Sequence, residues 1–168
     1  MLTRKGKYGL KAMLALVREH GNGPMLIGEL ADQERIPKKF LESILVELKH
    51  RGLVHSKKGP HGGYQLRRTP ERISVGEVIR ALDGPLALVS CVSQTAYAPC
   101  EECVTEKECA VRRVFQQVRD ETARILDGTT LAAVKALWPV LGAVPPAGPI
   151  GLAGSALPVF HGRAPPIA

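Results

Sequence analysis

A glycine-rich turn directly after an amphipathic segment constrains the fold of this chain more than any other feature. Residues 57–63 have the sequence KKGPHGG and separate two short segments, 53–56 and 64–67, in which apolar and polar residues alternate. Such alternation is typical of β-strands, and the glycine-rich connection favours a hairpin. The amphipathic segment before it has one apolar stripe at helical spacing, made of Phe40, Leu41, Ile44, Leu45 and Leu48. We therefore expect a helix followed at once by a β-hairpin.

Two further helices are predicted before this unit, over 4–20 and 27–34, where apolar residues recur at helical spacing. Pro37 is suited to the first position of the third helix because it has no amide proton to satisfy. Gly52 is suited to the position just after that helix ends. Three helices and a hairpin, in this order, predict a winged helix-turn-helix, so the expected fold class is mostly α with a small β-hairpin.

A second group of elements is expected after the hairpin. The sequence from Ser74 to Glu77 has a capping-box pattern, which predicts a helix that ends near Asp83. A long helix follows over 109–127, with apolar residues close to a seven-residue repeat. Thr129 or Thr130 then caps a short helix that runs through Leu137.

The expected organisation therefore has four parts. They are a winged helix-turn-helix DNA-binding domain (1–84), a cysteine-bearing sensor loop (85–109), a long dimerisation helix with a short C-terminal helix (110–138), and a disordered tail rich in Pro, Gly and Ala (139–168).

Positive charge is confined to the first part of the chain. Residues 1–72 contain 15 Lys and Arg against 7 Asp and Glu, whereas residues 73–168 contain 8 against 9. An excess limited to one module favours a polyanionic partner over a merely soluble basic face. No apolar run reaches the roughly 20 residues of a membrane helix, so we expect a cytoplasmic protein without a membrane partner.

The pattern of charges on the third helix and the turn predicts a surface for double-stranded DNA. The second helix of a helix-turn-helix enters the major groove and contacts base edges near its N-terminal end. Lys38, Lys39, Glu42 and Ser43 supply donors and acceptors there. Lys57, Lys58 and His61 belong to the wing, together with glycines that allow a close approach of the backbone.

The four cysteines predict a metal or redox site. Cys91, Cys100, Cys103 and Cys109 all lie within 19 residues, and their spacing is Cys-x8-Cys-x2-Cys-x5-Cys. Structural zinc sites usually have two tight Cys-x2-Cys pairs, whereas an iron–sulfur cluster tolerates wider spacing. Spacing alone ranks an iron–sulfur cluster first, zinc second and a thiol redox switch third.

The chain resembles the iron–sulfur transcription regulators of the IscR and NsrR type, in the Rrf2 family, which also includes the cluster-free thiol-metabolism regulator CymR. The resemblance covers roughly residues 1–137 and rests on five stretches: Leu2-Thr3 with Lys5-Gly6-Lys7-Tyr8, Phe40-Leu41-Glu42, Leu48 with Gly52-Leu53-Val54, Lys58-Gly59-Pro60 with Gly62-Gly63-Tyr64, and Ile73 to Ile79. It implies a homodimer on a pseudo-palindromic operator, with the long helix crossing to the partner. It also places Lys39, Phe40 and Glu42 at base-reading positions and Lys58 in the minor groove.

The same resemblance implies a ligand set for the cluster. Cys91, Cys103 and Cys109 match the three family cysteines, and Cys100 is additional. The fourth, non-cysteine ligand falls at Arg112 in IscR-like members or at the position of Lys7 in NsrR-like members, and neither residue ligates iron. Cys100, an exogenous ligand and a residue of the partner subunit are the open alternatives.

The sequence therefore predicts a transcription regulator whose operator affinity is tuned by a cysteine-ligated cluster, 2Fe–2S ahead of 4Fe–4S. The alternative is the same DNA-binding fold with a zinc or thiol switch. An enzyme is not expected, because no catalytic triad, phosphate loop or His-rich zinc motif is present. The predicted metal ligands are Cys91, Cys100, Cys103 and Cys109. The predicted DNA contacts are Lys38, Lys39, Phe40, Glu42, Ser43, Lys57, Lys58, His61, Gly62 and Tyr64.

Overall fold

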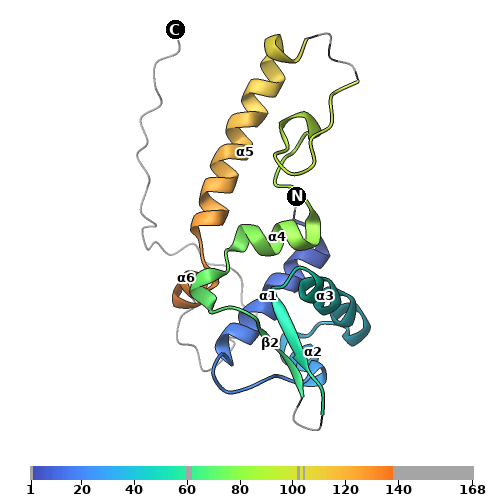
Figure 1. The fold of residues 1–168 in the computed structure, drawn as a ribbon, viewed down its shortest axis with the longest axis vertical. Coiled ribbons are helices and arrows are strands. Elements are labelled where there is room, and N and C mark those ends of the chain that lie inside the picture. Colours follow the sequence, from blue (N-terminus) through green and yellow to red (C-terminus); the bar gives the residue numbers. More distant parts are fainter. Residues whose placement is uncertain (1, 60–61, 102, 104, 138–168) are drawn as a thin grey trace, which may run out of the picture.

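The computed structural model describes residues 2–59, 62–101, 103 and 105–137 of the chain. In this part the fold is helical apart from one antiparallel hairpin (Figure 1). The helices and strands are α1 (Arg4–Arg18), α2 (Ile27–Glu34), α3 (Lys38–His50), β1 (Val54–Lys57), β2 (Gly63–Leu66), α4 (Val75–Asp83), α5 (Ala110–Gly128) and α6 (Leu131–Leu137). Short 3-10 turns occupy Pro70–Arg72, Ser90–Val92 and Glu106–Glu108.

The first three helices agree with the sequence prediction to within a few residues. α1 begins behind Thr3, whose side-chain oxygen accepts a hydrogen bond from the Gly6 amide. α3 begins at Lys38, so the placement of Pro37 at the first helical position was wrong by one residue. Pro37 is the N-cap, and its carbonyl oxygen accepts the Leu41 amide at 2.9 Å, which closes the first turn.

The hairpin pairs Val54 with Leu66 and Lys57 with Gly63. Each strand is shifted by one residue from its predicted range. An additional bridge links Met25 to Tyr64, with N–O distances of 2.9 and 2.8 Å between their backbones. The hairpin is therefore attached to the segment that leads into α2, which fixes the wing relative to the helix-turn-helix.

The hydrophobic core lies among α1, α3 and α4. The apolar stripe that predicted α3 faces this core, with Leu41, Ile44, Leu45 and Leu48 fully buried. Phe40 is only half-buried at the edge of the core. Met13 of α1 is fully buried against the same cluster. Burying side chains of this size typically contributes about 1.5–3 kcal/mol each, so this cluster stabilises the module that carries the basic residues.

α4 is capped by one half of the predicted capping box. The Ser74 hydroxyl oxygen accepts the Glu77 amide at 3.1 Å, but the Glu77 carboxylate pairs with Arg68 instead of the helix end. α4 ends at Asp83 as predicted, and the Asp83 carboxylate accepts the Thr3 amide at 2.8 Å. The end of α4 is thus tied to the start of α1.

α6 returns to the N-terminal module and completes its core. The Leu131 amide donates to the Ile73 carbonyl, and the Val75 amide donates to the Thr129 carbonyl, both at 2.9 Å. Leu131 is fully buried in the same cluster as the side chains of α1 and α3. Thr130 caps α6, as the sequence predicted. The division into 1–84, 85–109 and 110–138 stays a prediction, and the predicted tail over 139–168 lies outside the described residues.

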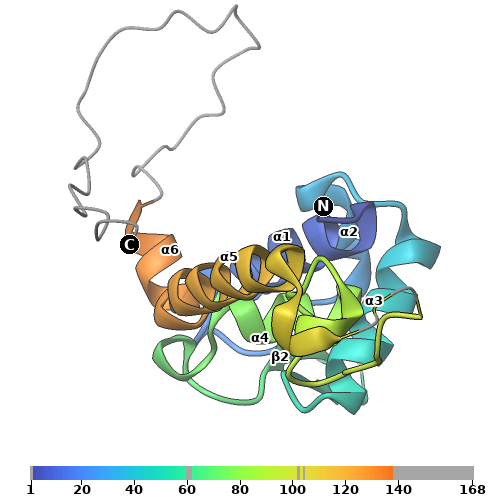
Figure 2. The ribbon, with the colours of Figure 1, turned by 90° about the horizontal axis from the view of Figure 1, so that it is seen from above.

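α5 projects from the module, with one end beside α4 (Figures 1 and 2). It buries none of its own side chains within the chain. Its apolar residues Val111, Val114, Val118 and Ile125 are 59%, 57%, 40% and 55% exposed. Four residues of the predicted stripe therefore lack a covering surface in the single chain, whereas its other members, Phe115, Thr122 and Leu126, are partly buried. No helix of the described residues is long and apolar enough to cross a membrane.

Candidate DNA-binding surface and cysteine loop

The first turns of α3 present most of the predicted DNA-contacting side chains to solvent. Lys38, Lys39, Glu42 and Ser43 are exposed. The Ser43 hydroxyl donates to the Phe40 carbonyl at 2.8 Å, so its oxygen is left to accept hydrogen bonds from a ligand. Solvent-exposed donors and acceptors on one helix end are what readout of base edges in the major groove requires.

Phe40 is packed against the protein, unlike the other predicted DNA-contacting residues of α3. Its ring packs edge-on against Tyr8, with centroids 5.7 Å apart and an interplanar angle of 73°. Edge-to-face contacts of this kind stabilise a fixed ring orientation. Phe40 can therefore present only part of its ring beside Lys39 and Glu42, and it also anchors α3 to α1.

The wing combines exposed lysines with an anchored base. Lys57 and Lys58 are exposed, whereas Tyr64 is half-buried and bound through its backbone to Met25. A Cβ atom on Gly62 would lie 2.3 Å from the Lys57 carbonyl oxygen, so the tight turn requires glycine there. His61 lies outside the described residues.

One contact that the sequence did not predict positions the wing against α3. The Lys49 ammonium group donates to the Ser56 hydroxyl at 2.7 Å, which links the last turn of α3 to β1. The spacing of seven residues gave no signal for this pair, because it depends on how the chain turns at Gly52. The link holds the two predicted DNA-contacting elements in a fixed relation.

Only some cations of this module have a carboxylate partner among the described residues, and those of the predicted DNA surface are not among them. Lys5 pairs with Glu47, and both Lys11 and Arg18 pair with Glu34. Lys38, Lys39, Lys57 and Lys58 have no carboxylate partner in the described part of the chain. Their charges are thus available to a polyanion, and the N-terminus of α3 adds favourable backbone dipoles.

The four cysteines all lie in the segment between α4 and α5. Cys91 is buried in the turn Ser90–Val92, whereas Cys100 is exposed and Cys103 and Cys109 are partly exposed. Cys109 is the N-cap of α5, and its sulfur accepts the Arg112 amide at 3.4 Å. The last cysteine is therefore attached directly to the long helix.

Three of the thiols influence one another. Hydrogen bonds with the thiols of Cys100 and Cys109 raise the pKa of Cys103 to about 11. The Arg112 amide, and then the Cys103 thiol, lower the pKa of Cys109. Of Cys103 and Cys109, a negative charge on sulfur is thus better stabilised at Cys109, beside the N-terminus of α5.

The donor chemistry of this loop fits a cluster, since soft thiolates are its usual ligands. Within the described residues no three or more His, Cys, Asp or Glu side chains form a group that could hold a metal ion. Cys103 has Cys100 and Cys109 as neighbours, and Cys91 is not among them.

Polar residues that sequence reasoning missed tie the loop to α5. The Arg119 guanidinium donates to the Val92 carbonyl at 2.8 Å, next to Cys91. Arg112 lies 3.7 Å from the Glu106 carboxylate, which also accepts the Tyr97 hydroxyl and raises the pKa of Tyr97. The Glu106 carboxylate is therefore bound by two side chains, Tyr97 and Arg112, that lie near the cysteines.

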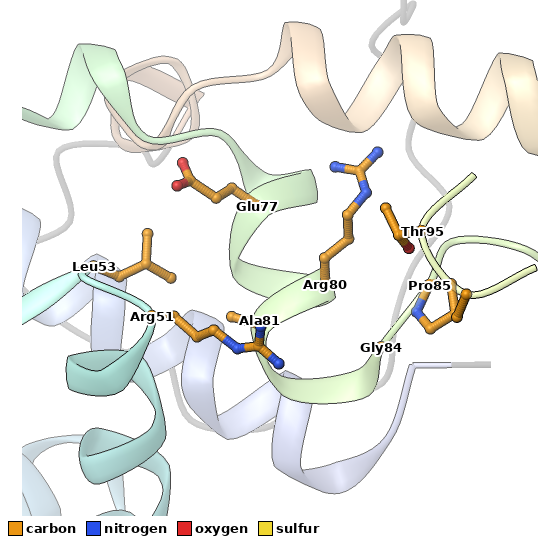
Figure 3. A pocket seen from close by; sticks show the side chains of 9 residues that line it. Arg51, Leu53, Glu77, Arg80, Ala81, Gly84, Pro85 and Thr95 are labelled. Carbon is orange, nitrogen blue, oxygen red and sulfur yellow. The ribbon is translucent and has the colours of Figure 1, made fainter. Parts of the chain in front are cut away.

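α4 connects the loop and α5 to the DNA-binding module. The Arg80 guanidinium donates to both oxygens of Asp127 in α5, at 2.6 and 2.7 Å. Arg80 also lines a pocket of about 460 Å³ whose walls include Arg51 and Leu53 after α3 and Thr95 of the cysteine loop (Figure 3). α3, α4 and the loop thus meet around one cavity.

Comparison with known proteins identifies the family. Residues 2–136 match the Rrf2 family model, described as an iron-dependent transcriptional regulator. The chain belongs to the Rrf2 family. An rrf2-like HTH-type regulator of Rhodobacter capsulatus is 40% identical over 134 residues, which covers 78% of this chain and 89% of the relative. The matched relatives are named as transcriptional regulators, so this Rrf2 protein is a DNA-binding regulator and not an enzyme.

Both branches named by the sequence resemblance are represented among the relatives. CymR of Bacillus subtilis is 34% identical over 130 residues, covering 77% of this chain and 86% of CymR. IscR of Aliivibrio salmonicida is 31% identical over 130 residues, covering 77% of this chain and 74% of IscR. Family membership therefore confirms the DNA-binding fold. It does not decide between an iron–sulfur cluster and a cluster-free switch in the cysteine loop.

Solved structures support the same fold. The structure of CymR, the global cysteine regulator of B. subtilis, has a TM-score of 0.69 at 32% identity and covers 82% of this chain and 98% of its own. The oxidised form of Staphylococcus aureus CymR has a TM-score of 0.62 at 29% identity, covering 80% and 95% of the two chains. These neighbours confirm the winged helix-turn-helix with its long helix.

Proposed function

We propose that this Rrf2 regulator binds its operator with an affinity set by an iron–sulfur cluster in the cysteine loop. The observation that carries the proposal is the position of the cysteines. All four lie between α4 and α5, and Cys109 itself caps α5. A change at these sulfurs therefore acts on the helix that meets the DNA-binding module.

Cys91, Cys103 and Cys109 are the proposed ligands that match the family, and Cys100 is the proposed fourth. Cys100 is favoured because Arg112, at the position of the IscR-type ligand, faces the Glu106 carboxylate. Such a cluster, 2Fe–2S ahead of 4Fe–4S, supplies a site whose oxidation or loss can report iron and redox status. The protein contributes four thiols, the buried environment of Cys91 and the amide of Arg112.

On DNA, we propose a homodimer on a pseudo-palindromic operator. The exposed stripe of α5 supplies the interface between the two copies, and α3 of each copy enters a major groove. The wing lysines, Lys57 and Lys58, lie beside it and contact phosphates or the adjacent minor groove. A shift of α5 would change the spacing of the two α3 helices, and two-fold operators are sensitive to half-site spacing.

The coupling follows the contacts between α5 and α4. Arg80 and Asp127 join the two helices, and a Cβ atom on Gly76 would lie 2.1 Å from the Asp127 carboxylate. The close approach leaves little freedom for α5 to move without α4. Coupling requires only that the cluster favour one of two dimer arrangements.

A thiol switch is the second candidate, favoured by the contacts of Cys103 with Cys100 and with Cys109 and by the oxidised CymR neighbour. Two thiols would lose two electrons and two protons to a peroxide and form one disulfide, while the peroxide is reduced to two molecules of water. The Cys109 thiolate, whose pKa is lowered, is the expected attacking group on an oxidised neighbouring sulfur.

Anaerobic reconstitution separates the two candidates. The full chain is incubated with iron and sulfide, and then iron, inorganic sulfide and visible absorption are measured for the wild type, Cys100→Ser and Cys103→Ser. We expect a coloured wild type, loss of the cluster in Cys103→Ser and a less stable cluster in Cys100→Ser. A colourless wild type without iron or sulfide would exclude the cluster. A peroxide-dependent loss of two free thiols in that protein, with altered DNA binding, would support the thiol switch.

A further inference from the structure

The turn between α2 and α3 contains an unusual backbone conformation. Arg35 has φ 53° and ψ 48°, and it is the only non-glycine residue with positive φ in the part of the chain that the structure describes. Its amide donates to carbonyls at the end of α2, as in a left-handed helix cap. Glycine is the residue usually found in such a position, because a Cβ atom makes the left-handed region unfavourable. The side chain at position 35 therefore destabilises the turn relative to glycine.

The Arg35 side chain makes no contact within the chain that compensates for this conformation. It is exposed, and no hydrogen bond or ion pair of its guanidinium is present among the described residues. The adjacent carboxylate, Glu34, is already bound by Lys11 and Arg18. The positive charge of Arg35 therefore has no partner among the described residues of the chain.

The turn is placed where a helix-turn-helix meets the DNA backbone. Only Ile36 and Pro37 separate Arg35 from the first residue of α3. In this motif the first helix crosses the phosphate backbone while the second lies in the major groove. The turn that carries the Arg35 guanidinium would therefore lie beside the strand that borders the groove. The planar fork of a guanidinium matches the oxygens of a phosphate.

The geometry points to Arg35 as a phosphate-binding residue of this protein, a contact that fixes α3 in the groove and carries no base specificity. This inference rests on the DNA-binding function of the family. The competing explanation is a purely structural role, in which the cation interacts with the C-terminal dipole of α2. The two explanations make opposite predictions for stability and for the salt dependence of binding.

The test compares Arg35→Gly, Arg35→Asn and Arg35→Lys in the full chain, all held in the same cysteine state. Glycine and asparagine accept the left-handed conformation without the charge, and lysine keeps the charge. Arg51→Gln is the matched control, because it removes one exposed charge from the same module at the other end of α3. Dissociation constants are measured against salt concentration on two duplexes, the upstream region of the protein's own gene and a random sequence.

We expect Arg35→Gly and Arg35→Asn to bind both duplexes about tenfold more weakly than the wild type, because a charged hydrogen bond to phosphate is removed. The salt slope should fall in magnitude by about 0.9 per protomer, and Arg35→Lys should retain the slope. The thermal midpoint of Arg35→Gly should be unchanged or about 2–4 °C higher. Arg51→Gln should keep the wild-type slope.

Unchanged affinity and slope in Arg35→Gly and Arg35→Asn would overturn the inference, as would weakening on only one of the two duplexes. A lower thermal midpoint in both variants with normal DNA binding would support the structural role instead. These results differ from failure of the DNA-binding function itself, in which the wild type would bind neither duplex.

Discussion

The unpaired lysines on α3 and the wing give this protein its clearest surface for DNA. Lys38 and Lys39 stand on the first turn of α3, where unsatisfied amides also attract phosphate, and Lys57 and Lys58 stand on the wing. Lys5, Lys11 and Arg18 of the same module are instead paired with carboxylates. The lysines of α3 and those of the wing have different proposed roles. In the proposed complex the α3 lysines would contact base edges and phosphates, whereas the wing lysines would contact phosphates and the minor groove.

Replacing Lys58 should weaken DNA binding without changing its sequence preference. Lys58→Gln removes a charge but no packing, because the side chain is exposed. We expect the salt slope to fall in magnitude by about 0.9 per protomer, and the loss of affinity to be similar on specific and random duplexes. Fluorescence anisotropy over a range of salt concentrations measures both quantities. A slope equal to that of the wild type would remove Lys58 from the interface.

Replacing Glu42 should instead change the sequence preference. Glu42 is exposed on α3, and a carboxylate there can accept a hydrogen bond from a cytosine amino group. In Glu42→Ala we expect discrimination at one base pair to fall by about 1–3 kcal/mol, with the salt slope preserved. Selection of bound sequences from a random library, for both proteins, measures the change. An identical set of selected sequences would contradict this role.

For single residues, the sequence alone predicted which side chains are exposed better than it predicted which side chains are held in place by contacts. Lys39 and Glu42 are exposed as their polarity implies, but Phe40 is partly locked by Tyr8 and Tyr64 is tied to Met25. Both restraints come from segments distant in sequence, so no local pattern encodes them. The conformation of Arg35 was equally invisible, because nothing in its residue type favours positive φ.

α4 is the element that relates the cysteine loop and α5 to the DNA-binding module. Asp83 at its end binds Thr3 before α1, and Arg80 binds Asp127 in α5. The paired guanidinium lowers the pKa of Asp127 below the usual range of an aspartate. The Arg80–Asp127 pair is thus a side-chain link between α5 and α4, beside the backbone hydrogen bond that joins the end of α5 to Val75.

The Arg80–Asp127 pair should give a stability contribution that depends on pH. Because the folded-state pKa of Asp127 is lowered, its contribution is fully present above the usual aspartate pKa and is lost as pH falls through the lowered value. Asp127→Asn should cost about 0.5–1 kcal/mol at pH 7, and the difference from the wild type should shrink below about pH 4. Urea unfolding at pH 7, 5 and 3 measures it. An equal difference at all three values would contradict the assignment.

A second prediction concerns the close approach of α4 and α5. Gly76→Ala places a methyl group against the Asp127 carboxylate, which must shift from its place on Arg80 to make room. We expect a loss of about 1–3 kcal/mol, as for other overpacked sites. Gly28→Ala is the matched control, since no atom lies within 4 Å of a Cβ there and alanine is the better helix former. Thermal melting of both variants tests the difference, and equal midpoints would exclude a tight contact.

The elements themselves were largely predictable from local signals. Thr130, Ser74 and Asp83 mark helix boundaries as their sequence context indicated. Pairings such as Arg80 with Asp127 or Lys49 with Ser56 were not predictable, because they depend on how the helices cross. The same is true of the core position of Leu131, which brings α6 back to α1.

For the whole molecule, the exposed stripe of α5 is the basis of the proposed homodimer. Val111, Val114, Val118 and Ile125 lie on one helix that buries no residue within the chain. A second copy of α5 would cover this stripe with side chains of the same kind. A dimer would also place two copies of α3 on one duplex, as a pseudo-palindromic operator needs.

A charge within the stripe should separate the two copies. In Val114→Glu a carboxylate would be buried in the proposed interface, whereas Gln116→Glu adds the same charge on the opposite side of α5. We expect light scattering to give a mass near the 18.1 kDa of one chain for Val114→Glu and twice that value for the wild type and Gln116→Glu. A wild type that has the mass of a single chain at all concentrations would refute the dimer.

The central claim is that the state of the cysteine loop sets the affinity for DNA. The most direct measurement is an anaerobic titration of the cluster-bearing and metal-free forms of the full chain against the upstream region of its own gene. We predict dissociation constants that differ by at least about fivefold, with the difference reduced in Asp127→Asn, which weakens the link between α5 and α4. Equal dissociation constants for the two forms would contradict the claim and leave only a DNA-binding protein with an unconnected cysteine loop.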